Sequence, residues 1–279
     1  MTQRFINRAA AGRLLAEKLA PLAGRPGLLV LALPRGGVPV AAEVAHRLGV
    51  PLDVLEVRAL EAPSRSVPPP AARLGSEVNA VAGTIGPGLA WRRRMLQPGP
   101  RVHRIWKTPA AAAGQELFFS SGYSLGAVAS GDYRVFNRKV RDTSGVKQEV
   151  IEALTARELQ KLHRHEQAYR HGRPALVLRG RPVILTDDAI VTASTLRVAV
   201  AAVREARAGP IIVAAPVAAR ESYLELRSNV QGFVTLCLPR EFGAVGQYYA
   251  DYDPVADTLV RELLDRAWQE NAAVAPVSV

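Results

Sequence analysis

The segment from Leu33 to Pro39 has the composition of an anion-binding loop. It reads Leu-Pro-Arg-Gly-Gly-Val-Pro, follows a short apolar run and precedes a helical pattern. The adjacent glycines Gly36 and Gly37 can adopt positive φ values and let backbone amides approach a ligand closely. The N-terminus of the next helix would add free N–H groups, and Arg35 a planar guanidinium that suits phosphate oxygens. A tight turn that leaves Arg35 in solvent is the alternative interpretation.

Two adjacent carboxylates and a hydroxyl-rich turn follow a second apolar run. Asp187 and Asp188 come directly after an expected strand, at the position where α/β sheets bind their ligands. These carboxylates could accept hydrogen bonds from sugar hydroxyls or hold a hydrated Mg²⁺. The turn Thr192–Thr195 opens a helix and could surround a phosphate with backbone amides and hydroxyls. The alternative is an Asx-turn at the aspartates and a hydroxyl that caps the helix.

The two loops together indicate more than either does alone. If both follow strands of one parallel sheet, they lie at the same edge, because the carboxyl ends of parallel strands meet there. Two anion-binding loops would then flank a pair of acids. A ligand with phosphates at both ends and a diol between them would fit this arrangement.

The elements that must position these loops alternate between strands and helices. We therefore expect an α/β fold with a doubly wound, mainly parallel, Rossmann-like sheet flanked by helices, in one principal domain covering residues 1–279. Apolar runs predict strands at 28–33, 50–57, 125–131, 182–186, 210–217 and 232–238, and helical patterns cover 9–23, 38–48, 145–169, 195–207, 219–227 and 254–268.

Composition narrows the class of protein. The chain has 279 residues, 48% of them hydrophobic, which is enough for one sizeable core. Its apolar runs are too short to span a bilayer, and its first residues lack the features of a secretory signal, so we expect a cytoplasmic protein without a membrane contact. The single cysteine, Cys237, excludes an intramolecular disulfide and a cysteine-based zinc site, and its apolar neighbours predict a buried side chain.

Residues 62–121 interrupt the alternation. They carry isolated glycines, Pro68–Pro70 and an alanine run without sustained periodicity, which is typical of an irregular insertion. Much of the formal net charge of +11 gathers around this stretch, including the triplet Arg92–Arg94 beside Trp91. Cations mixed with aromatic residues also occur in proteins that bind single-stranded nucleic acid, so nucleic-acid binding is an alternative function for this segment.

At its loops and its ends, the sequence resembles the type I phosphoribosyltransferase family, particularly bacterial members of unassigned substrate. The loop around the paired aspartates is the most specific match, and the arginine–diglycine loop supports it. The resemblance extends over most of the chain outside residues 60–121. The matching stretches are Phe5–Arg13, Leu31–Val40, Val183–Thr195 and Phe242–Asp251.

The resemblance implies a site for magnesium phosphoribosyl pyrophosphate, a nucleobase-like small-molecule acceptor and, by analogy, a homodimer. Arg35, Asp187 and Asp188 would be the catalytic residues, and both aspartates would also hold Mg²⁺, in part through water. Arg35, Gly36 and Gly37 would bind the pyrophosphate, and Asp187 and Asp188 would bind the ribose hydroxyls. The 5′-phosphate would lie in the turn formed by Thr192, Ala193, Ser194 and Thr195, and Ala189 would be a further substrate-binding residue. Phe242 and Tyr248 could flank the acceptor base.

Three departures from the family pattern keep a second function open. Ala189 and Ala193 stand where relatives have glycine, and an alanine forced to positive φ would cost about 1 kcal/mol. The segment Val57–Glu61 lacks the lysine of relatives, and the 62–121 insertion occupies the region of their mobile loop. The alternative function is therefore a catalytically weakened or inactive regulator that binds nucleotides or phosphoribosyl pyrophosphate.

Overall fold

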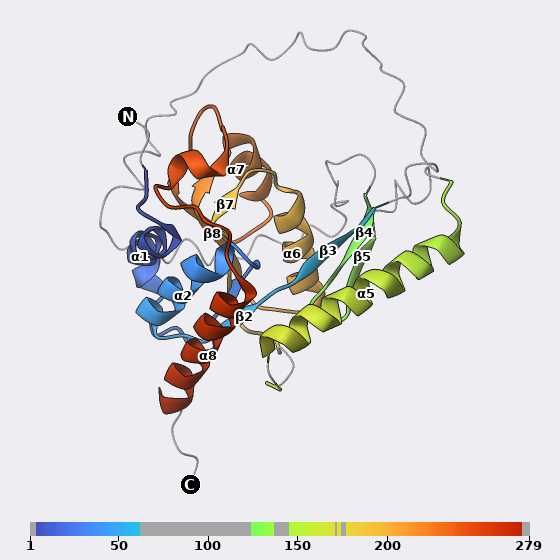
Figure 1. Cartoon of the computed structure of the whole chain (residues 1–279), viewed down its shortest axis with the longest axis horizontal. Helices are drawn as coiled ribbons and strands as arrows, with labels where there is room; N and C mark the ends of the chain where they lie inside the picture. The colour runs from blue at the N-terminus through green and yellow to red at the C-terminus, as the bar shows by residue number, and fades with distance from the viewer. Residues whose placement is uncertain (1–3, 62–123, 137–144, 171, 174–176, 275–279) are drawn as a thin grey trace.

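The computed structural model describes residues 4–61, 124–136, 145–170, 172–173 and 177–274 (Figure 1). The predicted insertion at 62–121, with its arginine triplet and the alternative of nucleic-acid binding, lies outside the described residues.

A parallel sheet forms the centre of the molecule. β1 pairs with β2 on one side and β6 on the other, and β8 pairs with β6, β7 and β9, all of them parallel. The predicted α/β class with a mainly parallel sheet is therefore confirmed. The strands are β1 Leu29–Ala32, β2 Leu52–Val54, β6 Val183–Thr186, β7 Ala189–Ile190, β8 Ile211–Ala218 and β9 Gly232–Cys237.

Helices cover both faces of this sheet, because successive strand residues point to opposite sides. Val30 and Ile184 contact one apolar cluster, with side chains of α1, α2 and α8, whereas their neighbours Leu31 and Leu185 contact a second cluster with α6 and α7. The doubly wound prediction is thus confirmed. None of the described helices combines the length and apolarity needed to cross a bilayer. The helices are α1 Arg8–Leu19, α2 Gly37–Leu48, α5 Gln148–Arg170, α6 Ser194–Glu205, α7 Arg220–Leu226 and α8 Asp257–Val274, with 3-10 turns η1 Ala20–Leu22 and η3 Val245–Tyr248.

A second, antiparallel sheet packs beside the first. It consists of β3 Val57–Glu61, β4 Ser124–Ala129 and β5 Tyr133–Phe136. The long helix α5 lies along it, as Figure 1 shows, and buries Leu162 against Leu60 of β3. The sequence did not predict β5.

The single strand predicted at 50–57 is wrong in one respect, since the chain changes sheets within it. Leu55 still donates its N–H to Ala32 O of the parallel sheet at 2.9 Å. The next residue, Glu56, instead donates its N–H to Ser130 Oγ at 2.8 Å, and its carbonyl accepts from Ser130 N–H at 3.0 Å. An apolar run does not reveal this change, because both halves are buried in sheets.

Candidate functional site

The two predicted loops are neighbours at the switch point of the parallel sheet. The chain passes from β1 to β2 on one side and later enters β6 on the other, so the connections leave β1 and β6 in opposite directions. Ligands of open α/β sheets bind in the crevice that this reversal creates at the carboxyl ends of the strands. Leu33 N–H donates to Thr186 O at 2.9 Å, which joins the two loops at their bases.

Gly36 and Gly37 allow the loops to touch. A Cβ at Gly36 would overlap the carboxylate of Asp188, and one at Gly37 would lie 2.7 Å from Thr186 O and 2.9 Å from Asp187 Cα. Neither glycine uses the positive φ that this residue permits, because Gly36 has φ −59° and Gly37 is the first residue of α2. Glycine is needed at both positions for close approach rather than for an unusual backbone conformation.

Arg35 projects from the same loop and is about half exposed. The preceding peptide bond, Pro34–Arg35, is cis. Arg35 Nη1 lies 3.6 Å from Asp257 Oδ1, to which the hydroxyl of Tyr169 donates a hydrogen bond at 2.6 Å. That hydrogen bond is the main cause of a lowered pKa at Asp257. An exposed ion pair at this distance is weak, so the guanidinium can turn to an incoming anion at small cost.

Asp187 and Asp188 have different surroundings. Asp187 Oδ1 accepts the N–H of Asp188 at 2.8 Å, and the residue as a whole is partly exposed. Burial of its carboxyl group, together with the neighbouring charge of Asp188, raises the pKa of Asp187 well above its usual value. Asp188 is buried, and its Oδ2 accepts from Arg8 Nε at 2.7 Å and from the Tyr252 hydroxyl at 3.1 Å. Asp187 is therefore the more available of the two carboxylates.

The hydroxyl-rich turn Thr192–Thr195 leads into α6, which begins at Ser194, without capping it. Thr192 Oγ1 and Ser194 Oγ share a hydrogen bond of 2.9 Å, Thr195 is exposed, and the N-cap residue is Ala193. No side chain makes a cap hydrogen bond at this end, and no acidic residue lies in the first turn of α6. The alternative of a hydroxyl cap is wrong, and the first amides of α6 remain suited to an anion.

The two alanines of this loop adopt ordinary backbone conformations. Ala193 has φ −72° and ψ −12°, and Ala189 lies in β7. Among the described residues other than glycine, only Asp132 and Arg207 have positive φ. The expected cost of alanine at positive φ therefore does not arise at either position.

Sequence reasoning missed the residues that hold Asp188. The N-terminal and C-terminal segments pair beside the site: Phe5 N–H donates to Tyr248 O at 2.8 Å, and Ala250 N–H donates to Phe5 O at 2.7 Å. From these segments come Arg8 and Tyr252, whose guanidinium and ring lie 3.9 Å apart. Both segments belong to, or directly follow, the stretches that carry the family resemblance, which was the available signal.

The proposed acceptor residues lie on the loop after β9. The rings of Phe242 and Tyr248 are 5.2 Å apart. Tyr248 is buried in a cluster with Phe5 and Tyr249, against which Phe242 packs from a partly buried position. Cys237, predicted to be buried, is only partly so and packs on this cluster, and burial raises the pKa of its thiol.

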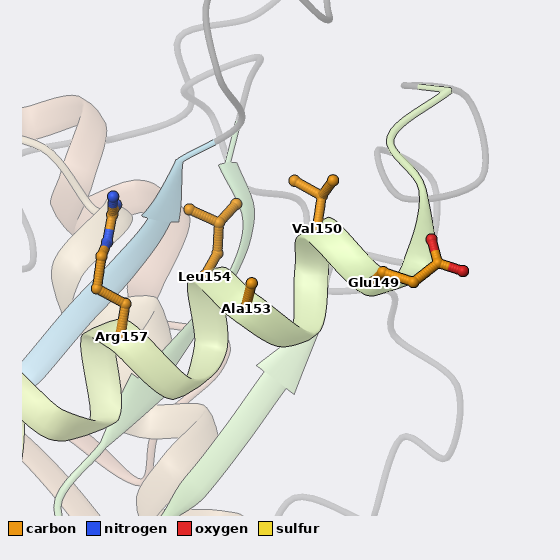
Figure 2. A pocket seen from close by; sticks show the side chains of 5 residues that line it. All are labelled: Glu149, Val150, Ala153, Leu154 and Arg157. Atoms are coloured by element: carbon orange, nitrogen blue, oxygen red, sulfur yellow. The ribbon is translucent and has the colours of Figure 1, made fainter.

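A shallow groove on α5 contains neither the glycine loop nor the paired aspartates of the candidate site. Figure 2 shows Val150 and Leu154 on the same side of the helix, and Ala153, Glu149 and Arg157 complete the lining. The groove lies near the end of α5 that is remote from the parallel sheet (Figure 1). Its lining is mostly apolar, so the candidate site for chemistry remains the edge of the parallel sheet.

Comparisons with known proteins bear on the family and the fold of the chain. No family model matches the chain. Two curated relatives from Mycobacterium tuberculosis, "Putative phosphoribosyl transferase MT0597" of strain CDC 1551 / Oshkosh and "Putative phosphoribosyl transferase Rv0571c" of strain H37Rv, are each 30% identical over 273 residues. These matches cover 98% of this chain and 49% of each relative, so the chain spans about half the length of the curated relatives it matches.

A solved structure is similar over nearly its whole length. The crystal structure of TT1426 from Thermus thermophilus has 32% identity and a TM-score of 0.66, with 94% of this chain and 98% of that chain covered. The fold, the two loops at its switch point and the relatives named phosphoribosyl transferase lead to the same assignment. The chain belongs to the type I phosphoribosyltransferase family.

Proposed function

We propose that the chain binds magnesium phosphoribosyl pyrophosphate and transfers its phosphoribosyl group to a nucleobase-like acceptor, with release of pyrophosphate. The observation that carries this proposal is the contact of Gly36 and Gly37 with the loop of Asp187 and Asp188 at the switch point. Such a contact brings an anion-binding loop, a carboxylate pair and the N-terminus of α6 to one edge of the sheet.

Each part of the proposed ligand has a chemically matching partner. The pyrophosphate meets the backbone around Gly36 and the guanidinium of Arg35, which neutralises negative charge. The ribose hydroxyls donate to Asp187, a residue that is partly exposed at this edge. The 5′-phosphate meets the uncapped first turn of α6 and the hydroxyls of Thr192–Thr195. The aromatic residue Phe242 remains a candidate contact for the acceptor base.

The donor set fits a magnesium ion that arrives with the ligand. No group of three or more His, Cys, Asp or Glu side chains within the described part of the chain could hold a metal. Magnesium commonly uses one or two carboxylates, completed by water and substrate phosphates. Asp187 offers such a carboxylate, whereas that of Asp188 is engaged by Arg8 and Tyr252. When bound, the ion would neutralise charge on the pyrophosphate.

The reaction needs positioning rather than a covalent nucleophile. A ring nitrogen of the acceptor forms a bond to the anomeric carbon, the bond from that carbon to the pyrophosphate oxygen breaks, and the nitrogen proton passes to solvent. Arg35 stabilises the charge that grows on the leaving group. The two loops hold the ribose and both phosphate ends so that the anomeric carbon faces the acceptor.

Titration calorimetry tests this proposal directly. The chain is titrated with magnesium phosphoribosyl pyrophosphate and, separately, with magnesium pyrophosphate, and pyrophosphate release is then measured with a panel of nucleobases. Micromolar binding with acceptor-dependent release supports the enzyme. Binding without release for every acceptor favours the regulator instead. No heat and no thermal stabilisation at millimolar ligand would contradict both the enzyme and a regulator that binds phosphoribosyl pyrophosphate.

A further inference from the structure

Arg8 makes three contacts at the candidate ribose site. Its Nε donates to Asp188 Oδ2 at 2.7 Å, and its Nη1 donates to Asp253 O at 2.7 Å. Its guanidinium also lies over the ring of Tyr252, 3.9 Å from the ring centroid. These contacts use two separate nitrogens and the flat face of the group at once, which an ammonium group cannot reproduce.

Two tyrosines also hold Asp188. The Tyr252 hydroxyl donates to Asp188 Oδ2 at 3.1 Å, and the Tyr249 hydroxyl donates to Asp188 O at 2.6 Å. The rings of Tyr249 and Tyr252 stack at 5.2 Å with an angle of 22°. Both the carboxylate and the backbone of Asp188 are therefore bound by the N-terminal helix and the C-terminal segment.

The position of Asp188 determines the geometry around it. Gly36 is packed so closely on its carboxylate that a Cβ would overlap Oδ2. Asp187 precedes it and accepts its N–H. The side chains of Arg8 and Asp188 are 12% and 10% exposed, so loss of the arginine would leave a buried carboxylate without its cation. Asp188 would then shift, and Asp187 with it.

The start of α1 holds Arg8 firmly. Asn7 is the N-cap residue and its side chain accepts the N–H of Ala10 at 2.8 Å, so Arg8 is the first residue of a capped helix. Phe5, just before the cap, pairs through its backbone with Tyr248 and Ala250. A guanidinium on such a support has little freedom to move.

We infer that Arg8 is a positioning residue for the proposed ribose site: by fixing Asp188 it sets the carboxylate of Asp187 for the sugar hydroxyls and ties this geometry to the paired chain ends. This inference rests on the proposed function. It predicts that Arg8 matters more for a ligand with a ribose than for pyrophosphate alone, because the pyrophosphate loop is also held by β1 and α2.

The test compares Arg8→Met, Arg8→Lys and the matched control Arg13→Met by titration calorimetry. Arg13 lies on the same helix in an exposed ion pair with Glu43, so its replacement removes the same charge away from the site. We expect Arg8→Met to weaken magnesium phosphoribosyl pyrophosphate binding about tenfold or more and magnesium pyrophosphate binding less than about twofold. Arg8→Lys should recover part of the loss, and Arg13→Met should bind as the wild type does.

The outcomes separate this inference from the proposed function. A wild-type chain that binds no magnesium phosphoribosyl pyrophosphate refutes the function and the positioning role together. A wild type that binds, beside a folded Arg8→Met that binds equally well or loses both ligands equally, refutes only the positioning role. If circular dichroism shows that Arg8→Met does not fold, Tyr252→Phe replaces it. This variant keeps the ring under Arg8 but removes a hydrogen bond to Asp188, and an affinity loss of about threefold, confined to the ribose ligand, is then expected.

Discussion

Asp187 and Asp188 are adjacent in the sequence but have different roles in the structure. Asp188 is buried and bound by Arg8 and Tyr252, so it joins the ends of the chain to the sheet edge. Asp187 is partly exposed at the same edge and accepts a backbone N–H of its own loop. Two residues of one type, read as equal partners in the sequence, therefore divide into one carboxylate that is bound within the fold and one that we propose to face the ligand.

Separate Asp→Asn variants should reveal this division. Asp187→Asn should abolish turnover without lowering the free energy of unfolding, because it removes a charge from a site that disfavours it. Asp188→Asn should lower the free energy of unfolding by about 3 kcal/mol, because the guanidinium of Arg8 loses its buried partner. Urea denaturation and a pyrophosphate-release assay measure the two effects. Equal stability of both variants would contradict the division.

At the scale of elements, the close approach of two loops determines the geometry of the candidate site. The turn after β1 and the turn after β6 meet at Gly36 and Asp188 with no room for a Cβ. The neighbouring turn at Ala193 needs no glycine, since its backbone angles are ordinary. A glycine in the family pattern can therefore be required at one loop and replaceable at another, depending on what its missing side chain would meet.

Gly36→Ala should disrupt the site. A methyl group there must displace the Asp188 carboxylate or the loop, so binding of magnesium phosphoribosyl pyrophosphate should fall below detection and stability should drop. Gly49→Ala is the matched control: Gly49 ends α2 with φ +63° and no atom within 4 Å of an added Cβ. It should lower stability by about 1 kcal/mol through backbone strain alone, with wild-type affinity by calorimetry.

The crossing from the parallel to the antiparallel sheet places a titratable group between them. Glu56 is buried there, next to Arg58 and His165, at 3.3 and 3.1 Å. Burial raises the pKa of Glu56 above its usual value of 4.5, while His165 and Arg58 oppose the shift. The folded chain therefore holds this proton more tightly than the unfolded chain does, and the contribution of Glu56 to stability falls as pH rises above about 4.5.

Glu56→Gln should remove that dependence. As pH rises from 4.5 through the raised pKa, the free energy of unfolding of the wild type should decrease relative to that of the glutamine variant. Urea denaturation at a series of pH values measures the difference. A difference that is constant over this range, or that grows in favour of the wild type, would show that the carboxyl group titrates normally in the folded chain.

At the scale of the whole molecule, an N-terminal segment and the segment before α8 pair with each other and complete the candidate site. Phe5 is buried against Tyr249, with ring centroids 5.7 Å apart, and its backbone pairs with Tyr248 and Ala250. Arg8 and Tyr252 then extend from these segments to Asp188. The site thus depends on residues more than two hundred positions apart.

Phe5→Ala should weaken both stability and binding. Removal of this buried ring should cost about 3 kcal/mol of unfolding free energy and loosen the pairing that holds Arg8 and Tyr252. Phe233→Ala, in the apolar cluster on the other face of the sheet, should lose a similar amount without changing the affinity of the folded chain for magnesium phosphoribosyl pyrophosphate. Calorimetry below the unfolding temperature checks this contrast, and equal affinities for both variants would exclude the coupling.

The sequence by itself determined the fold class and the two loops. Short apolar runs followed by glycine, aspartate and hydroxyl residues indicate strands that end at a ligand-binding edge. The sequence reveals this pattern because it depends only on residues that are close neighbours along the chain. Gly36, Asp187 and the turn before α6 were therefore found from their own neighbours along the chain.

Only the tertiary structure decided which side chains complete the site and what the glycines are for. Arg8 and Tyr252 meet Asp188 across the whole length of the chain, and Gly36 is required by an atom of a loop far away in sequence. The change of sheets at Glu56 likewise depends on Ser130, a residue of another strand connection. Such contacts arise from the order of strands in the sheet, which brings distant segments together and leaves no periodic signal in either of them.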